Sequence, residues 1–382
     1  MRNPEDKPLR WLAASVTAMV SIPLFAGVLP DDRADALYHS YSGGGLDVNG
    51  PSILIRKQVG SSVSISGNYY VDSISSASID VLTNASPYKE ERTEMSADVT
   101  YLHEKTTMGL GYTVSTENDF DAQSAHFSFS QDIFGDLTTV SMGFGRGWDT
   151  VGKTGDPSFS QDTDRYSYSV GLSQVLTKNM LLDIGLQIIT DEGFLNNPYR
   201  TVRFCEPTDC SAYQFQLERY PNTRSSHALA FRTKYYLEYH AAIHGEYRFF
   251  RDTWGIRANT FEFTYTQPLK TKWTLDVRFR YYQQSQADFY SDLFPRRDAQ
   301  NYLARDKELS TFQSTTIGFG VSYDFIDNGW KWIDSGSINL AWDLMMFQYD
   351  NFRDLTRGGT VGNEPLYSFN ADVVQLFFSI WY

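Results

Sequence analysis

Alternation of apolar and polar residues is clearest at the C-terminus, over residues 374–382. Every second position there is apolar or aromatic, whereas Gln375 and Ser379 lie on the opposite face of an extended strand. The apolar row comprises Val374, Leu376, Phe378, Ile380 and Tyr382. A strand that shows apolar groups to lipid and ends on an aromatic ring is typical of the closing strand of an outer-membrane β-barrel. We therefore expect it to be the assembly signal that the barrel-assembly machinery binds.

Similar alternating runs recur along the chain, at lengths that suit tilted strands crossing a bilayer with about 9–11 residues each. The predicted strands span 52–58, 62–74, 94–103, 106–116, 122–134, 138–149, 165–177, 180–191, a run that ends near residue 239, 243–252, 256–269, 273–288, 312–326 and 336–349. Short links between them alternate with longer ones at 75–93, 150–164, 192–225, 289–311 and 350–366. Because external loops are the longer set in such barrels, we expect the short links on the periplasmic side.

The alternation of links also predicts the number of strands. The run 52–58 leads into a short link, so an earlier strand must bring the chain up from the periplasm. Leu37–Tyr41 is the candidate, with Gly43–Gly45 and Gly50–Pro51 turning the chain over. The expected fold is thus an all-β, antiparallel up-and-down barrel of about 16 strands. If the pairing of this first strand fails, 14 strands is the alternative, which is also even.

Charged residues gather on the predicted inward face of the C-terminal half. In the run 273–288, Leu275 and Val277 face lipid, whereas Asp276 and Arg278 face the lumen. The predicted lumen-facing charged wall consists of Arg232, Lys234, Glu238, His244, Glu246, Arg248, Glu262, Asp276, Arg278 and Arg280. In the N-terminal half the inward positions that we assign are nearly all Ser, Gly, Thr or Asn. The lumen is therefore expected to be lopsided.

Two interpretations of the charged wall are open. Its basic residues could form a ladder that selects anions. Alternatively, opposite charges on adjacent strands could pair with one another and fill the lumen structurally. The near balance of signs favours pairing, because a selective pore would show a surplus of one sign.

The first residues of the chain predict an export signal. Arg2, Lys7 and Arg10 precede an apolar run that Pro23 interrupts, which is typical of a secretory signal peptide cleaved near residue 26. A transmembrane anchor is the alternative, although Pro23 and the polar residues of the run disfavour it. Beyond this segment the sequence contains no window of 18 apolar residues. We therefore divide the chain into a signal peptide (1–26), a periplasmic segment (27–35) and the barrel (36–382).

Composition agrees with this location. Aromatic residues make up 15% of the chain, yet its mean hydropathy is polar, at -0.39. Strands that alternate lipid-facing and lumen-facing residues beneath aromatic girdles have this combination. The net charge of -13 argues against a nucleic-acid partner. The expected surroundings are the lipids of a Gram-negative outer membrane.

The two cysteines and the acidic loops suggest a disulfide and a candidate cation site. Cys205 and Cys210 are expected to form a loop disulfide, with ligation of a metal by two thiolates as the alternative. Acidic residues on the external side could hold a surface calcium ion; they are Asp149, Asp156, Asp162 and Asp164 in one loop and Glu117, Asp119 and Asp121 in another. Their spacing is irregular, so we favour a solvated acidic surface and predict no resident cofactor.

Hydrolytic chemistry has two candidate residue sets. Ser225, Ser226 and His227 could combine with Glu218, and His126 could combine with Ser128. No nucleophile motif surrounds either set, and 6 histidines among many serines produce such combinations by chance. We therefore do not expect an enzyme.

Several stretches resemble a family of Gram-negative outer-membrane proteins that is known only as a domain of unknown function. The resemblance covers most of the chain after residue 26; the stretches that carry it are 29–35, 78–81, 86–94, 288–294, 304–310 and 364–382. It implies the compartment but no activity. Members of that family are often encoded beside a thioredoxin-like protein, a small lipoprotein and a flavin transferase, which implies a link to redox chemistry in the envelope.

These observations lead to two functional hypotheses. The first is a porin-like channel or transport pore, or the membrane part of an envelope assembly, which the family resemblance links to redox chemistry through partner proteins. The alternative is a surface receptor or scaffold whose lumen is blocked and whose long external loops bind a partner.

Overall fold

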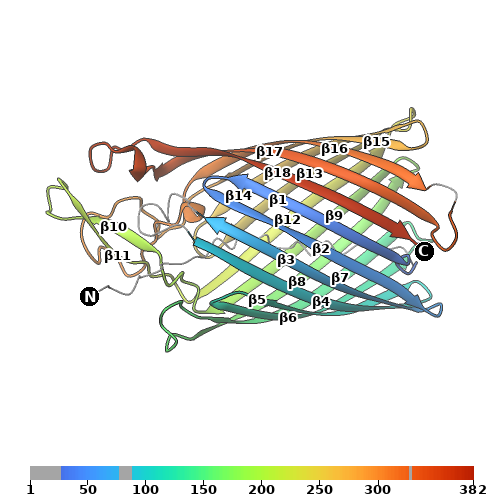
Figure 1. The fold of residues 1–382 in the computed structure, drawn as a ribbon, viewed down its shortest axis with the longest axis horizontal. Coiled ribbons are helices and arrows are strands. Elements are labelled where there is room, and N and C mark those ends of the chain that lie inside the picture. Colours follow the sequence, from blue (N-terminus) through green and yellow to red (C-terminus); the bar gives the residue numbers. More distant parts are fainter. Residues whose placement is uncertain (1–26, 77–87, 327–328) are drawn as a thin grey trace.

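The computed structural model describes residues 27–76, 88–326 and 329–382, and these residues form a closed antiparallel barrel of sixteen strands (Figure 1). The wall strands are β1 (Arg33–Gly43), β2 (Leu46–Val59), β3 (Val63–Ser76), β4 (Tyr88–His103), β5 (Thr106–Thr116), β6 (Phe120–Ile133), β7 (Thr138–Val151), β8 (Gln161–Thr177), β9 (Met180–Gly193), β12 (Thr223–Tyr236), β13 (Ala242–Asp252), β14 (Arg257–Leu269), β15 (Trp273–Gln284), β16 (Phe312–Ile326), β17 (Ser335–Arg353) and β18 (Leu366–Trp381). The predicted fold class and strand number are confirmed. The predicted signal peptide lies outside the described residues.

The first and last strands close the barrel. β1 pairs with β18 along its whole length, from Arg33 opposite Trp381 to Gly43 opposite Ala371. The predicted apolar row of β18 faces outward, and Val374, Leu376 and Phe378 are exposed on the barrel surface. Closure leaves no sheet edge with unpaired backbone groups, which hydrocarbon could not solvate.

The start of the barrel differs from the prediction. β1 begins at Arg33, so the barrel includes residues 33–35 that we assigned to the periplasmic segment. The turn after β1 is also shorter than expected, because it uses only Gly44 and Gly45, both with positive φ. Gly50 and Pro51 are not part of the turn. They lie inside β2, where the chain does not change direction.

An apolar belt surrounds the outside of the barrel. On β15, Trp273, Leu275, Val277 and Phe279 alternate with half-buried polar residues and are all exposed. Neighbouring strands show the same alternation, which only a hydrocarbon environment makes favourable for so many apolar side chains. No helix among the described residues is long and apolar enough to cross a bilayer. The closed sheet and its exposed apolar belt identify the protein as a bacterial outer-membrane barrel whose strands cross the lipid.

The two ends of the barrel are different. The C-terminus lies at the end with the short turns, and β10 (Thr201–Cys205) and β11 (Tyr213–Leu217) project at the opposite end, within the connection from β9 to β12 (Figure 1). Two short 3-10 helices, η1 (Lys307–Leu309) and η2 (Leu355–Arg357), lie in the connections that follow β15 and β17. The long loops are therefore gathered at the external end.

A charge in the apolar belt should destabilise the barrel according to its depth. Val277→Arg places a guanidinium near the middle of the belt and should lower the free energy of unfolding by about 2–4 kcal/mol. Gln283 faces outward on the same strand near the external interface, so Gln283→Arg should cost only about 0–1 kcal/mol. Urea titration of folding into lipid vesicles measures both values. Equal losses for the two variants would contradict the assignment of this face to lipid.

Candidate functional site

The inner wall is polar on most strands. On β15 the inward positions alternate with the apolar belt and carry Thr274, Asp276, Arg278 and Arg280. On β8 and β7 they are mainly serine and glycine. A surface of this kind needs water, ions or polar solutes against it. The lumen is therefore the first candidate for a functional site.

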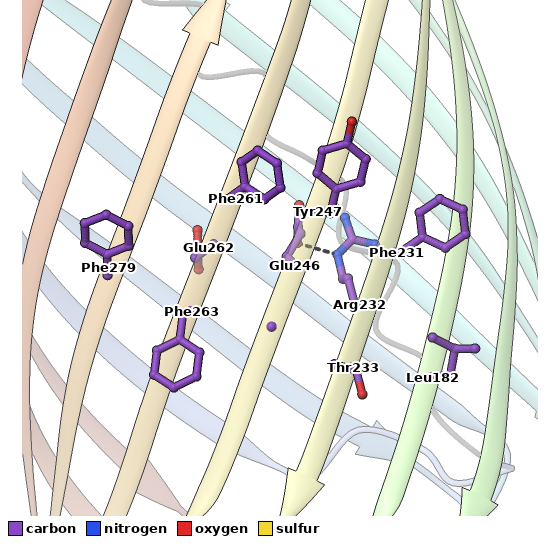
Figure 2. A pocket seen from close by; sticks show the side chains of 11 residues that line it. Leu182, Phe231, Arg232, Thr233, Glu246, Tyr247, Phe261, Glu262, Phe263 and Phe279 are labelled. Atoms are coloured by element: carbon purple, nitrogen blue, oxygen red, sulfur yellow. Dashed lines mark hydrogen bonds and ion pairs between the residues drawn. The ribbon is translucent and has the colours of Figure 1, made fainter.

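Opposite charges of the predicted charged wall lie close together. Arg232 Nε on β12 donates to Glu246 Oε2 on β13 over 2.7 Å, and Figure 2 shows this pair. Arg280 Nε and Glu262 Oε2 are 3.9 Å apart on β15 and β14. Two of the basic residues are thus neutralised by acids on the neighbouring strand.

The other members of the charged wall are placed less uniformly. Asp276 accepts a hydrogen bond from the Thr266 hydroxyl, and the Arg248 guanidinium lies 5.6 Å from the ring centroid of Phe250. Lys234 is exposed near the periplasmic end of β12, and His244 Nδ1 is buried without a hydrogen-bond partner in the described structure.

Glu238 does not belong to the wall. β12 ends at Tyr236, and the chain turns over residues 237–241, where Glu238 is exposed. The prediction extended the strand alternation too far, because this turn is closed by a hydrogen bond from Leu237 N to Ala241 O, which the polarity pattern does not reveal.

The N-terminal half of the lumen carries more charge than predicted. Arg165 on β8 pairs with Asp191 on β9 at 2.6 Å. On β1, His39 Nε2 lies 2.7 Å from Asp72 Oδ1 of β3 and 3.0 Å from Tyr70 Oη. Small residues line the lumen over the inward stretches that we assigned in the N-terminal half. Nearer the external end, however, β1, β3, β4 and β8 place charged residues there. The lumen is less lopsided than expected.

Three ion pairs reach across a complete strand: the His39–Asp72 pair, which passes β2 at Gly50, and two others. In these two the intervening strand has a glycine opposite both partners. Arg278 of β15 pairs with Asp343 of β17, and Gly318 of β16 lies opposite both. His126 Nε2 of β6 lies 3.3 Å from Asp98 Oδ1 of β4, and Gly111 of β5 lies between them. A Cβ on Gly318 would lie 2.0 Å from Asp343 Oδ1, and a Cβ on Gly111 would lie 2.2 Å from Asp98 Oδ1. Only glycine leaves room for the carboxylate at these positions.

Sequence reasoning missed Asp343 as a partner of the charged wall. One pattern could have revealed this pair: an inward glycine on a strand that lies between two strands of opposite charge. Recognising the pattern requires the register of all three strands. Register depends on the pairing of the folded sheet, and the alternation within one strand does not determine it.

Replacing Gly318 tests this crossing contact. Gly318→Ala should displace the Asp343 carboxylate, disrupt its ion pair with Arg278 and lower the free energy of unfolding by about 1–3 kcal/mol. Gly320 is two residues further along the same face, and a Cβ there would come no closer than 3.2 Å to Asp276. Gly320→Ala is therefore the matched control and should cost less. Urea unfolding in vesicles gives the comparison, and equal costs would contradict the proposed role of the glycine gap.

External loops form a connected lid, which we define as residues 194–222, 285–311 and 354–365. The segment 194–222 is anchored between β9 and β12 but reaches well beyond these strands. Tyr199 in this segment donates from its hydroxyl to Asp119 Oδ2 beside β6, over 2.6 Å. Arg203, four residues later, pairs with Glu364 between β17 and β18. The lid therefore connects the external ends of strands from both halves of the barrel.

A buried charge cluster holds the three lid segments together. Arg203 is 0% exposed, and its guanidinium binds the carboxylates of Asp292 and Glu364. Asp292 also pairs with Arg305, at 3.1 Å, and accepts from the backbone N–H of Arg353 over 3.2 Å. Each carboxylate is thus hydrogen-bonded more than once, which offsets the cost of removing these charges from water. Breaking one partner would leave an uncompensated buried charge.

A second buried carboxylate joins the first two lid segments. Glu218 accepts hydrogen bonds from the Tyr220 hydroxyl and from the backbone N–H of Arg305, both over 2.6 Å. Beside it, Arg200 Nη1 and Asp306 Oδ1 form an ion pair at 2.6 Å. Burial raises the pKa of Glu218 to about 7; the charge of Asp306 adds to this rise, and Arg200 opposes it.

The two cysteines form a disulfide in the lid, and part of one acidic set forms a cluster. The structure joins Cys205 and Cys210 by a disulfide next to Arg203 in the lid. Glu117 and Asp119 lie with Glu90 of β4 in a cluster whose ligand atoms are within 4.8 Å of one another. Asp121 is exposed on β6 and is not part of it. The aspartates of the 149–164 region form no such cluster within the described residues.

The candidate hydrolytic residues do not form a triad. Ser226 and His227 are consecutive in β12 and therefore point to opposite faces of the wall, whereas Ser225 shares the face of His227 but has no acid of the predicted set beside it. Glu218 is occupied by Tyr220 and Arg305 in the lid. His126 and Ser128 share the inward face of β6, but the imidazole lies beside Asp98.

A pocket of about 470 Å³ lies on the outer wall over Gly245 (Figure 2). Gly245 faces lipid between Thr233 and Phe263, and the absence of a side chain leaves a notch among Phe231 and Phe261. Because the notch is apolar and faces hydrocarbon, lipid chains would fill it.

The lid should respond to pH through Glu218. The folded-state pKa is raised above the ordinary value of 4.5, so the stabilisation is complete below about pH 4.5 and is lost as the pH rises through about 7. Between pH 6 and pH 8 the ionised fraction should increase from about one tenth to about nine tenths. Cleavage of the lid by proteinase K should therefore be several-fold faster at pH 8 than at pH 6.

Glu218→Gln is the control for this experiment, because its amide oxygen can accept from the Arg305 N–H, its NH2 group can donate to the Tyr220 hydroxyl, and the side chain does not ionise. The ratio of wild-type to variant cleavage rates at each pH removes the pH dependence of the protease itself. A ratio that stays constant from pH 6 to pH 8 would show that Glu218 does not control the lid.

Comparison with known proteins gives one family match and several similar solved structures. No curated protein matches the chain. Similar solved structures include a bacterial polysaccharide outer membrane secretin, at 8% identity and a TM-score of 0.48, which covers 93% of this chain and 100% of that one. The outer membrane protein OmpT of Vibrio cholerae is similar at 10% identity and a TM-score of 0.43, over 91% of this chain and 96% of that one. A Pseudomonas aeruginosa FadL homologue is similar at 8% identity and a TM-score of 0.43, over 92% and 90%.

Similarity at this level does not indicate what the chain transports or binds. The match to a family model is more specific, because it extends over residues 10–336 and thus over most of the chain. The chain belongs to the family described as "Protein of unknown function (DUF3570)".

Proposed function

We propose that this barrel is a gated, selective transport pore for polar solutes. The observation that carries the proposal is a polar, ion-paired inner wall beneath a lid that a buried charge cluster holds together. Water and polar solutes suit such an interior, whereas a purely structural plugged barrel would have no need of a separate lid. The lid supplies the gate.

Charge pairing within the wall supports a particular class of solute. Arg232, Arg278 and Arg280 each have a carboxylate partner, so the wall has little surplus of one sign. A selective ion pore would use such a surplus. Neutral or zwitterionic polar solutes, which can hydrogen-bond to both members of a pair, are the class that this wall favours.

The alternative is a surface receptor or scaffold with a blocked lumen. The extent of the lid favours it, because a rigid cap across the loops of both barrel halves could be permanent. A redox-linked envelope assembly stays a prediction from the family resemblance, since no contact between described residues supports it.

Conductance in planar bilayers tests the proposal. The wild type should show small and intermittent current steps. Arg203→Met leaves the Asp292 and Glu364 carboxylates short of a partner, and loss of a buried partner costs about 3–5 kcal/mol. The open population should therefore increase by at least about tenfold.

Arg219→Ala is the matched control, because Arg219 belongs to the same lid segment but its side chain forms only exposed contacts, with Asp298 and with the Gln300 carbonyl. It should conduct like the wild type. Silence of both the wild type and Arg203→Met, with heat-modifiable mobility showing intact barrels, would overturn the pore and support the blocked scaffold. Large steady steps in the wild type, unchanged in Arg203→Met, would overturn the gate.

A further inference from the structure

Two arginines lie side by side on the outside of the barrel. Arg251 of β13 and Arg257 of β14 are directly opposite each other in the strand register, and both are exposed. They alternate with the outward residues Tyr247 and Phe261, so they point away from the lumen. Like charges directly opposite in a sheet are destabilising, which makes the arrangement unfavourable without a ligand.

Neither guanidinium has a partner in the described chain. Among the described residues, none forms an ion pair or a hydrogen bond with either guanidinium; Arg257 contacts Ser285 through its backbone N–H alone. The nearest acid along β13 is Asp252, which faces inward and pairs with Arg224 at 2.6 Å. By contrast, the outward Arg146 of β7 has Asp164 at 3.1 Å. The Arg251–Arg257 pair is thus an exposed basic site in a chain whose net charge is -13.

The height of the pair on the barrel identifies its surroundings. Tyr247 and Phe261, whose ring centroids are 4.8 Å apart, belong to the aromatic outer wall around Gly245 (Figure 2). Arg251 and Arg257 each lie four residues from these rings towards the external end, about 13 Å along the strands. Because strands in such barrels are tilted, the height above the rings is smaller, about 10 Å. This is the headgroup region of the outer leaflet.

We propose that Arg251 and Arg257 bind a phosphate group on the headgroup of an outer-leaflet lipid. Two adjacent guanidinium groups offer planar, paired N–H donors that match phosphate oxygens, and the phosphate charge removes the repulsion between them. His227 lies opposite Arg251 on β12 and extends the basic site by one strand. The lipid source follows from the outward direction and the height, since a free anion would not need a site that faces the membrane.

Lipid binding by the purified full-length protein tests the proposal. Native mass spectrometry in detergent would compare bis-phosphorylated lipid A, the same lipid after removal of its phosphates, and inorganic phosphate. The wild type should retain the phosphorylated lipid at least tenfold more tightly than the dephosphorylated lipid. Arg251→Gln with Arg257→Gln should abolish this difference.

The control removes the same charge from elsewhere on the external side. Arg296 and Arg297 are exposed in the loop after β15, so their double replacement by Gln should leave lipid retention unchanged. Arg251→Lys with Arg257→Lys keeps the charge but loses the paired donors, and should give intermediate retention.

Two results would overturn the proposal. One is equal retention of the phosphorylated lipid by the wild type and by the Arg251→Gln, Arg257→Gln variant, with both proteins folded by heat-modifiable mobility. The other is retention of inorganic phosphate as tight as that of the lipid, which would identify a free-anion site.

Discussion

Closure of the hydrogen-bond ladder is the constraint on which this structure depends. Hydrocarbon offers no partner for backbone N–H and C=O groups, so a sheet can cross the membrane only if its first and last strands meet. β1 and β18 satisfy this requirement by pairing from Arg33 to Gly43. Once the ring is closed, alternation sends one set of side chains to lipid and the other to the lumen. The apolar belt, the polar inner wall and the separation of short turns from long loops all follow from this closure.

Charge in the lumen is tolerated because it is paired, and pairing depends on register. Arg232 and Glu246 meet on adjacent strands, whereas Arg278 must reach past Gly318 to Asp343. The glycine removes the only side chain that would separate them. The wall thus combines a polar surface with little net field, a property that suits polar solutes better than ions of one sign. Small residues in this barrel permit contacts across strands as well as leaving space.

The lid uses the same chemistry in a different setting. Outside the membrane the loops could be solvated, yet Arg203, Asp292 and Glu364 are buried together and draw three loop segments into one body. A buried charge cluster is more directional than an apolar contact, because its geometry must satisfy several hydrogen bonds at once. Such a contact is either made or broken, which is why we propose it as the gate. Glu218 adds a proton-dependent contact between two of the same segments.

The sequence by itself determined the barrel, its strand number and its location, because the period of two and the alternating link lengths are local properties of the chain. The same alternation placed Arg232 and Glu246 on one face of neighbouring strands, where they pair. It did not reveal that Glu238 lies in a turn, that Asp343 completes the pair with Arg278, or that the N-terminal half carries charge near the external end. It did not reveal the buried charge cluster of the lid either, because Arg203 and Glu364 are far apart in sequence and belong to loops without periodicity. These features were decided only by the tertiary structure, because register and loop docking depend on which distant backbones lie side by side once the ring has closed.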